Sequence, residues 1–160
     1  MPFAKISSSL NRGVEYSLSC LGLALAAVVA AQVFSRYVLN YSLFWSEELA
    51  RFLLVWLTFL GATVAYFHGA HASVDFLVRR LSARGQKAAT VCVHLGALAF
   101  SLIMLAYGWQ FAAFVRLQIS PALSLPKWIP HGVIPLSGAI MALHSLTFIS
   151  QNLGRPGRDR

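Results

Sequence analysis

The sequence predicts an all-α membrane protein with four transmembrane helices, an additional amphipathic helix at the membrane surface, and both termini in the cytoplasm. Hydrophobic residues make up 58% of the 160 residues and charged residues only 11%, against roughly 25% charged in soluble proteins. Four apolar runs come close to or exceed the roughly 20 residues that a helix needs to cross a bilayer. Lys and Arg residues are more numerous on one side of the membrane than on the other, and this difference predicts the orientation of the spans.

The expected spans belong to one integral membrane domain that takes in residues 1–160, and they lie at about 18–39, 49–67, 88–115 and 129–149. The first is rich in small residues, chiefly alanine, and such small side chains let helices approach closely in lipid. We therefore expect it to contact another helix. The third is the longest, so we expect it to tilt or to extend past the membrane surface. Pro135 is expected to kink the fourth slightly, and residues 153–160 to form a disordered tail.

Residues 68–87 are the one extended polar stretch. Its apolar residues recur at helical spacing, at Val74, Leu77, Val78 and Leu81. Asp75 and two arginines fall on the other faces of the same helix. This pattern is typical of an amphipathic helix that lies in the interface plane, here on the cytoplasmic side.

Lys and Arg placement fixes the expected topology. Nine basic residues fall on the side of the termini: Lys5, Arg12, Arg79, Arg80, Arg84, Lys87, Arg155, Arg158 and Arg160. Four fall on the other side: Arg36, Arg51, Arg116 and Lys127. The net charge of +8 therefore reflects the membrane topology. The same charges would also attract anionic membrane lipid. These residues flank the spans instead of forming a patch with interleaved aromatics, which argues against a nucleic-acid partner.

The segment Trp45-Ser46-Glu47-Glu48 precedes the second span and has two interpretations. In the structural one, Trp45 anchors the interface and Ser46 is the N-cap, while the acids sit in the first turn, where the helix dipole favours them. In the functional one, the segment is a contact surface for a partner protein. The residues leave both interpretations open.

Two ion pairs are expected near this segment. Arg36 ends the first span, so a short hairpin would bring its guanidinium to Glu47 or Glu48 at a modest desolvation cost. Glu47 and Arg51 are four residues apart and can pair along the helix surface.

Histidines raise two further possibilities. His94 and His144 lie at matching depth in the third and fourth spans, as two axial haem ligands would in a four-helix electron-transfer subunit. Hydrogen bonding between helices is the interpretation we favour. His68, His71 and Asp75 suggest a metal or proton site, but His71 and Asp75, the pair on one helical face, are too few for a closed metal site.

No set of residues typical of catalysis emerges, and we expect neither an enzyme nor a bound cofactor. The acidic residues are expected at or beyond the interfaces, whereas a cation-coupled carrier usually needs an intramembrane acid or a broken helix. A small autonomous exporter would likewise rely on a carboxylate within the first span, and residues 18–39 contain none. The chain is therefore not expected to move a substrate alone.

The stretch from Arg36 to Leu77 resembles the small membrane subunit of tripartite ATP-independent periplasmic (TRAP) transporters, the DctQ-like family. The resemblance is carried by Trp-Ser-Glu-Glu-Leu-Ala-Arg, which leads into the second span at residues 45–51. It is also carried by a Gly-x-His-x-x-Val-Asp pattern, matched by Gly69, His71, Val74 and Asp75. Many relatives have Ile after this His, and the chain departs from them with Ala72.

The resemblance implies a four-helix subunit of the bacterial inner membrane that assembles with a much larger multi-span permease subunit. In the family the larger subunit carries the substrate and sodium ions, and a periplasmic solute-binding protein delivers the solute, typically an organic acid. The small subunit would be a static scaffold. The residues that the resemblance offers as candidates for the partner and scaffold interface are Arg36, Trp45, Ser46, Glu47, Glu48, Arg51, Trp56, Gly61, His71 and Asp75.

Overall fold

The computed structural model describes residues 2–69 and 82–154, and these residues are helical apart from turns and one isolated β-bridge between Ile119 and Pro126. The helices are α1 (Pro2–Tyr37), α2 (Phe44–Phe67), α4 (Ala83–Phe114), α5 (Trp128–His131) and α6 (Val133–Gly154). Four stretches are long and apolar enough to cross a membrane: Lys5–Tyr37, Phe44–Phe67, Ala88–Phe114 and Trp128–Gln151. The prediction of an all-α protein with four long apolar helices is confirmed.

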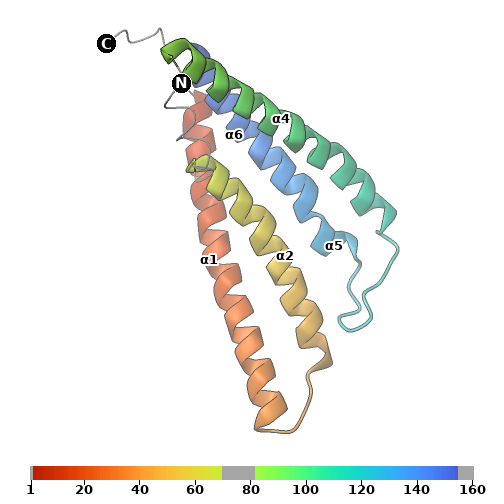
Figure 1. The fold of residues 1–160 in the computed structure, drawn as a ribbon. Coiled ribbons are helices and arrows are strands. Elements are labelled where there is room, and N and C mark those ends of the chain that lie inside the picture. The colour runs from red at the N-terminus through yellow and green to blue at the C-terminus, as the bar shows by residue number, and fades with distance from the viewer. Residues whose placement is uncertain (1, 70–81, 155–160) are drawn as a thin grey trace.

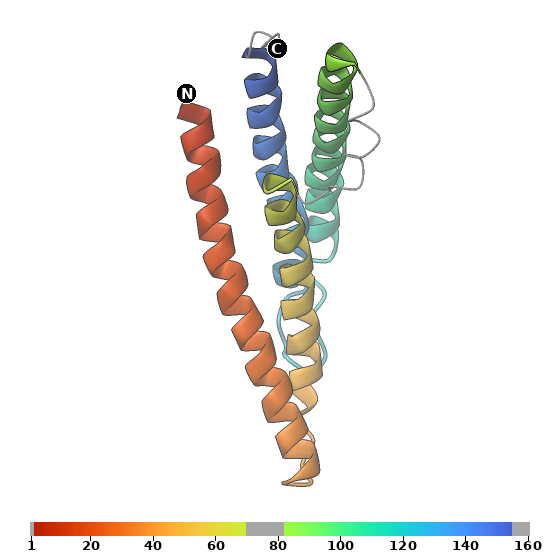
Figure 2. The ribbon, with the colours of Figure 1, turned by 60° about the vertical axis from the view of Figure 1, so that its left-hand side comes forward.

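The long helices run up and down and form an open bundle (Figures 1 and 2). α1 packs along α2, α2 along α6, and α6 along α4, so α2 and α6 lie in the middle and α1 and α4 on the outside. α1 begins and α6 ends at one end of the bundle, which we call the terminal end. The turn at residues 38–43 and the loop at residues 115–127 lie at the opposite end, the loop end.

Several boundaries differ from those expected. α1 runs without interruption from Pro2, and α4 begins at Ala83, where the Ser82 hydroxyl accepts a hydrogen bond from Gly85 N at 3.3 Å. Most of the expected interfacial helix at 68–87 falls on residues 70–81, outside the described residues. The expected tail overlaps the end of α6 at Gly154 and otherwise lies outside them as well.

The predicted N-cap of the second span is wrong. α2 begins at Phe44 with Leu43 as its N-cap residue, and no side chain caps it. Ser46 is buried inside the first turn, and its Oγ donates to the Leu43 carbonyl at 2.7 Å. The hydroxyl therefore bonds backward to a carbonyl instead of accepting from an exposed N–H at the helix start. The helix starts earlier because Phe44 and Trp45 continue the apolar, helix-compatible pattern of the span.

The fourth span is divided at Gly132, between α5 and α6, and not at Pro135. Pro135 is the third residue of α6, and backbone N–H groups in the first turn of a helix have no hydrogen-bond partner within the helix. A proline in that position costs no helical hydrogen bond, so it causes no kink there. The chain nevertheless continues in the same general direction from α5 into α6 (Figure 1).

The closest helix contact lies between α4 and α6 and depends on two glycines. A Cβ at Gly138 of α6 would lie 2.8 Å from Leu105 N and 2.8 Å from Ser101 O of α4. A Cβ at Gly108 of α4 would lie 2.8 Å from Ile134 Cγ2 of α6. The two backbones therefore approach closely, as small residues permit in membrane proteins.

The small residues of the first span do not form such a contact within this chain. Nothing lies within 4 Å of a Cβ built at Gly22. The alanines around it, Ala24, Ala26, Ala27, Ala30 and Ala31, are exposed. α1 instead turns larger apolar residues toward α2, and Leu18 and Leu21 pack against a small core of Val14, Leu60, Val133 and Ile140.

Replacing Gly138 with alanine should destabilise the protein, because the new methyl group would overlap the backbone of α4, which cannot move aside as a side chain can. Overpacking of this kind costs about 1–3 kcal/mol, and we expect a lower unfolding temperature in detergent. Gly96→Ala is the matched control, since a Cβ there meets nothing within 4 Å. Equal unfolding temperatures for the two variants would contradict this account of the α4–α6 contact.

Candidate functional site

The loop end carries the acidic and aromatic residues that the sequence singled out. Trp45 and Glu47 are exposed in the first turn of α2, and Arg51 is exposed one turn further on. We call these three residues the loop-end rim. A cleft of about 610 Å³ lies between the rim and the 115–127 loop and is lined in part by Glu47, Glu48 and Arg51. Lys127 and His131 also line this cleft, so acidic and basic side chains lie together there.

Glu48 connects the two helical hairpins at this end. Its Oε2 accepts hydrogen bonds from Ala122 N at 2.8 Å and from Leu123 N at 3.0 Å. A carboxylate that accepts two backbone N–H groups makes strong, charge-assisted hydrogen bonds. This contact fixes the tip of the 115–127 loop onto the start of α2. Sequence reasoning missed it, because nothing in either segment specifies a partner so far away in the chain.

Backbone hydrogen bonds within the loop orient the Ala122 and Leu123 N–H groups in one direction. Lys127 N bonds to Gln118 O at 2.8 Å, and Ser120 N bonds to Leu125 O at 2.9 Å. Ser124 adopts a φ of 54°, as a tight reversal requires. The backbone of residues 121–123 is thus left free to bond outward.

The predicted ion pairs at this end are not formed. Arg36 is exposed at the end of α1, and neither Glu47 nor Glu48 lies within ion-pair distance of it. Glu47 instead has Gln32 Nε2 at 3.5 Å, and it does not pair with Arg51. Among the side chains that the structure describes, Glu15 Oε1 lies 2.6 Å from His68 Nε2, a contact that is an ion pair when His68 is protonated. The hairpin is closed by Ser35, whose Oγ donates to the Tyr41 carbonyl at 2.7 Å.

The other candidate residues are dispersed. Trp56 packs against the apolar core, on the inner side of α2. Gly61 borders open space, since nothing lies within 4 Å of a Cβ built there. His71 and Asp75 lie outside the described residues. The structure thus brings together the candidates in the 45–51 segment and leaves Arg36, Trp56 and Gly61 apart from them.

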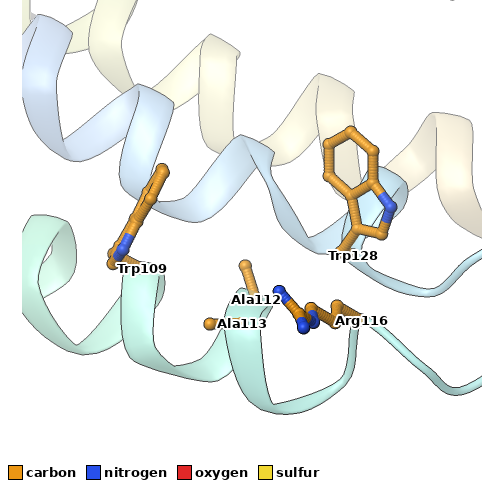
Figure 3. A pocket seen from close by; sticks show the side chains of 5 residues that line it. All are labelled: Trp109, Ala112, Ala113, Arg116 and Trp128. Carbon is orange, nitrogen blue, oxygen red and sulfur yellow. The ribbon is translucent and has the colours of Figure 1, made fainter.

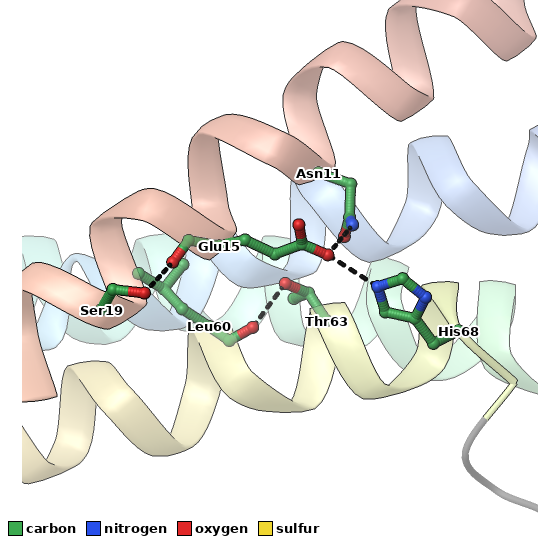
Figure 4. A network of polar contacts seen from close by, with 6 residues as sticks. All are labelled: Asn11, Glu15, Ser19, Leu60, Thr63 and His68. Atoms are coloured by element: carbon green, nitrogen blue, oxygen red, sulfur yellow. Dashed lines mark hydrogen bonds and ion pairs between the residues drawn. The ribbon is translucent and has the colours of Figure 1, made fainter.

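A polar cluster that the sequence did not predict lies at the terminal end (Figure 4). Glu15 Oε1 accepts from Asn11 Nδ2 at 2.7 Å and lies 2.6 Å from His68 Nε2. The cluster joins α1 to the end of α2. Glu15 and His68 lie at similar numbers of residues from the turn at 38–43, on either side of it. Their proximity could therefore have been predicted from the pairing of α1 with α2. The contact is partly exposed, and such pairs contribute at most about 1 kcal/mol.

His94 and His144 form hydrogen bonds between helices, as we favoured. His94 Nδ1 lies 2.7 Å from Tyr66 Oη, which also has Ser145 Oγ at 3.0 Å. His144 Nδ1 lies 2.7 Å from Ser7 Oγ, and His144 is fully buried. The histidines thereby link α2 to α4 and α1 to α6.

The surroundings of these histidines give no support to the haem alternative. Phe148 stacks on the His94 ring with 5.2 Å between centroids, and the Phe67 ring lies 5.0 Å from that of His144. Both imidazole rings are thus packed against phenyl rings, and their Nδ1 atoms are used in hydrogen bonds between helices. The part of the chain that the structure describes also contains no group of three His, Cys, Asp or Glu side chains able to hold a metal ion.

Replacing Glu48 with alanine should release the 115–127 loop, because Ala122 N and Leu123 N would lose their acceptor. Leaving such groups unpaired costs about 1–3 kcal/mol where they are buried, and less where water reaches them. We expect faster amide hydrogen exchange in residues 118–127, measured by mass spectrometry. Glu47→Ala removes a neighbouring carboxylate that bonds to no backbone group of the loop and should leave exchange unchanged. Identical exchange in the two variants would refute the proposed role of Glu48.

Comparison with known proteins identifies the family to which the sequence is similar. The family model of the DctQ component of tripartite ATP-independent periplasmic transporters matches residues 25–155. The isethionate TRAP transporter permease protein DctMQ of Oleidesulfovibrio alaskensis is 31% identical, over 78% of this chain and 21% of that protein. The ectoine TRAP transporter small permease protein TeaB of Halomonas elongata is 28% identical, over 88% of this chain and 74% of that protein.

A third relative is the C4-dicarboxylate TRAP transporter small permease protein DctQ of Rhodobacter capsulatus. It is 30% identical, over 75% of this chain and 54% of that protein. The chain thus spans about a fifth of the first relative and about half of the third. These relatives are permease components and not enzymes. With four apolar helices and a family match over most of its length, this chain is a multi-pass membrane protein that belongs to the DctQ family of TRAP transporter small permease components.

Proposed function

We propose that this chain is the small permease subunit of a secondary transporter and scaffolds a large multi-span permease subunit. The complex would take up an organic acid by cation coupling, with the solute delivered by a periplasmic binding protein. The observation that carries the proposal is the family match over residues 25–155. Isethionate and C4-dicarboxylates, named for two of the relatives, are both organic acids.

The proposed location is the bacterial inner membrane, with both termini in the cytoplasm. The nine-to-four division of basic residues supports this orientation. Under it, the terminal end with Lys5 and Arg12 faces the cytoplasm, and the loop-end rim faces the periplasm. The whole chain would act as one membrane domain, and the segment 68–87 would brace the scaffold at the cytoplasmic surface, with His71 and Asp75 as its candidate contacts.

The outer face of α1 is the surface that we propose for the large subunit. Its alanines are exposed along the helix and are not covered by α2 or by the other described helices. In lipid, apolar surface alone does not drive helices together, and association depends on close packing that small side chains allow. A helix of the large subunit could pack against α1 as closely as α4 and α6 pack against each other.

Ala27→Phe should weaken this association by roughly tenfold or more, because overpacking a close helix contact costs about 1–3 kcal/mol. The measurement is purification of the tagged chain from native membranes in mild detergent, with mass spectrometry of the proteins retained. The wild type should retain a large multi-span subunit in near-equal amount. Leu54→Phe, at an exposed position of α2 outside this face, is the control. A wild-type chain that purifies alone would overturn the scaffold role, and equal retention in both variants would overturn the α1 surface.

The loop-end rim is the surface that we propose for the binding protein. Trp45, Glu47 and Arg51 are exposed there, whereas the Glu48 carboxylate is used within the chain. Exposed charges at the edge of an interface chiefly set the association rate and the choice of partner. Glu47 is therefore a better probe of docking than Glu48, whose loss would also release the loop.

Glu47→Lys should slow docking of the periplasmic binding protein several-fold, because it reverses a charge on the rim. It should leave the amount of retained large subunit unchanged. The measurement is capture of the binding protein by the immobilised complex at low and high salt. Arg12→Glu, an exposed charge reversal at the terminal end, serves as the control. Unaltered capture with Glu47→Lys at low salt would exclude the rim as the docking surface.

A further inference from the structure

A second cleft at the loop end lies on the outside of the α4–α6 pair, away from the rim. One side of α4 supplies Trp109, Ala112, Ala113 and Arg116, which recur at helical spacing, and α5 supplies Trp128. Figure 3 shows the two indole rings on either side, with the small Ala112 between them and Arg116 beside Trp128. The cleft has a volume of about 300 Å³, enough for part of a lipid and too little for a globular ligand.

The cleft lies at the boundary of the apolar spans. The α4 span ends at Phe114 and the next begins at Trp128, so Arg116 stands just beyond the apolar part of the bundle. The Trp109 and Trp128 side chains remain 71% and 49% exposed. Indole rings favour this depth, where the ring is in an apolar layer and the N–H reaches polar groups.

Arg116 supplies an uncompensated positive charge at this boundary. Among the described residues, no carboxylate lies within ion-pair distance of it. A guanidinium presents a planar fork of donors that matches the oxygens of a phosphate group. The floor below it, Ala112 and Ala113, is apolar and small, which leaves space for a hydrocarbon chain between the two rings. Charge and shape together therefore suit a molecule with a phosphate at one end and an apolar chain at the other.

We propose that this cleft binds one glycerophospholipid of the adjoining leaflet. Its phosphate contacts Arg116, and the start of an acyl chain lies over Ala112 between Trp109 and Trp128. The site is independent of the alanine face of α1 and of the loop-end rim. It would hold a lipid at the outer surface of the α4–α6 pair, where the subunit would otherwise present an open groove.

The test uses native mass spectrometry of the delipidated chain together with any subunit that copurifies with it. The sample is incubated with phosphatidylglycerol, or with diacylglycerol that has the same acyl chains and lacks the phosphate. The wild type should retain one phosphatidylglycerol and no diacylglycerol. Arg116→Gln should lower the retained fraction about fivefold, as expected for one basic residue at a lipid surface. Trp109→Ala should lower it as well, at an exposed position where folding is not at risk.

Arg36→Gln is the matched control, because it removes an exposed positive charge at the same end of the bundle but outside the cleft. It should leave retention unchanged. Equal losses in Arg116→Gln and Arg36→Gln would mean general surface attraction and would overturn the site. Retention that does not depend on Arg116 would also overturn it. A complex that excludes phosphatidylglycerol while the lone chain binds it would identify a helix of the large subunit as the occupant and refute the proposal.

Discussion

Three side-chain hydrogen bonds connect all four long helices, and the bundle depends on them. Ser7 bonds to His144 between α1 and α6, Tyr66 to His94 between α2 and α4, and Ser145 to Tyr66 between α6 and α2. In lipid the helices have no hydrophobic drive to associate, so polar links and close packing must hold them together. Each such bond contributes on average about 0.6 kcal/mol. Their joint effect is to select one arrangement among helices that are all predominantly apolar.

The two ends of the bundle are joined by different means. At the terminal end, Glu15, Asn11 and His68 bridge α1 and α2 through side chains. At the loop end, Glu48 of α2 holds the backbone of the loop that precedes α5. Between them α4 and α6 touch through glycine, without polar contact being needed. The residues left exposed on α1 and at the loop end are the ones available to partners.

The candidate residues that the sequence grouped together have different surroundings in the structure. Ser46 bonds to its own backbone, Glu48 fixes a distant loop, and Trp56 packs in the core, whereas Trp45 and Glu47 remain exposed. The expected pair between Arg36 and the acids failed for a related reason: the hairpin was foreseen, but its rotation, which decides which side chains meet, was not.

The sequence by itself determined the number of spans, the helical class and the family, because apolar run length and a short motif are local properties of the chain. It also indicated that His94 and His144 would bond between helices, since polar groups inside apolar spans need partners. Only the tertiary structure decided which helices pair. The small residues of α1 and the glycines of α4 and α6 are equally suited to close packing. The choice between them depends on contacts between residues far apart in the chain, which no local pattern encodes.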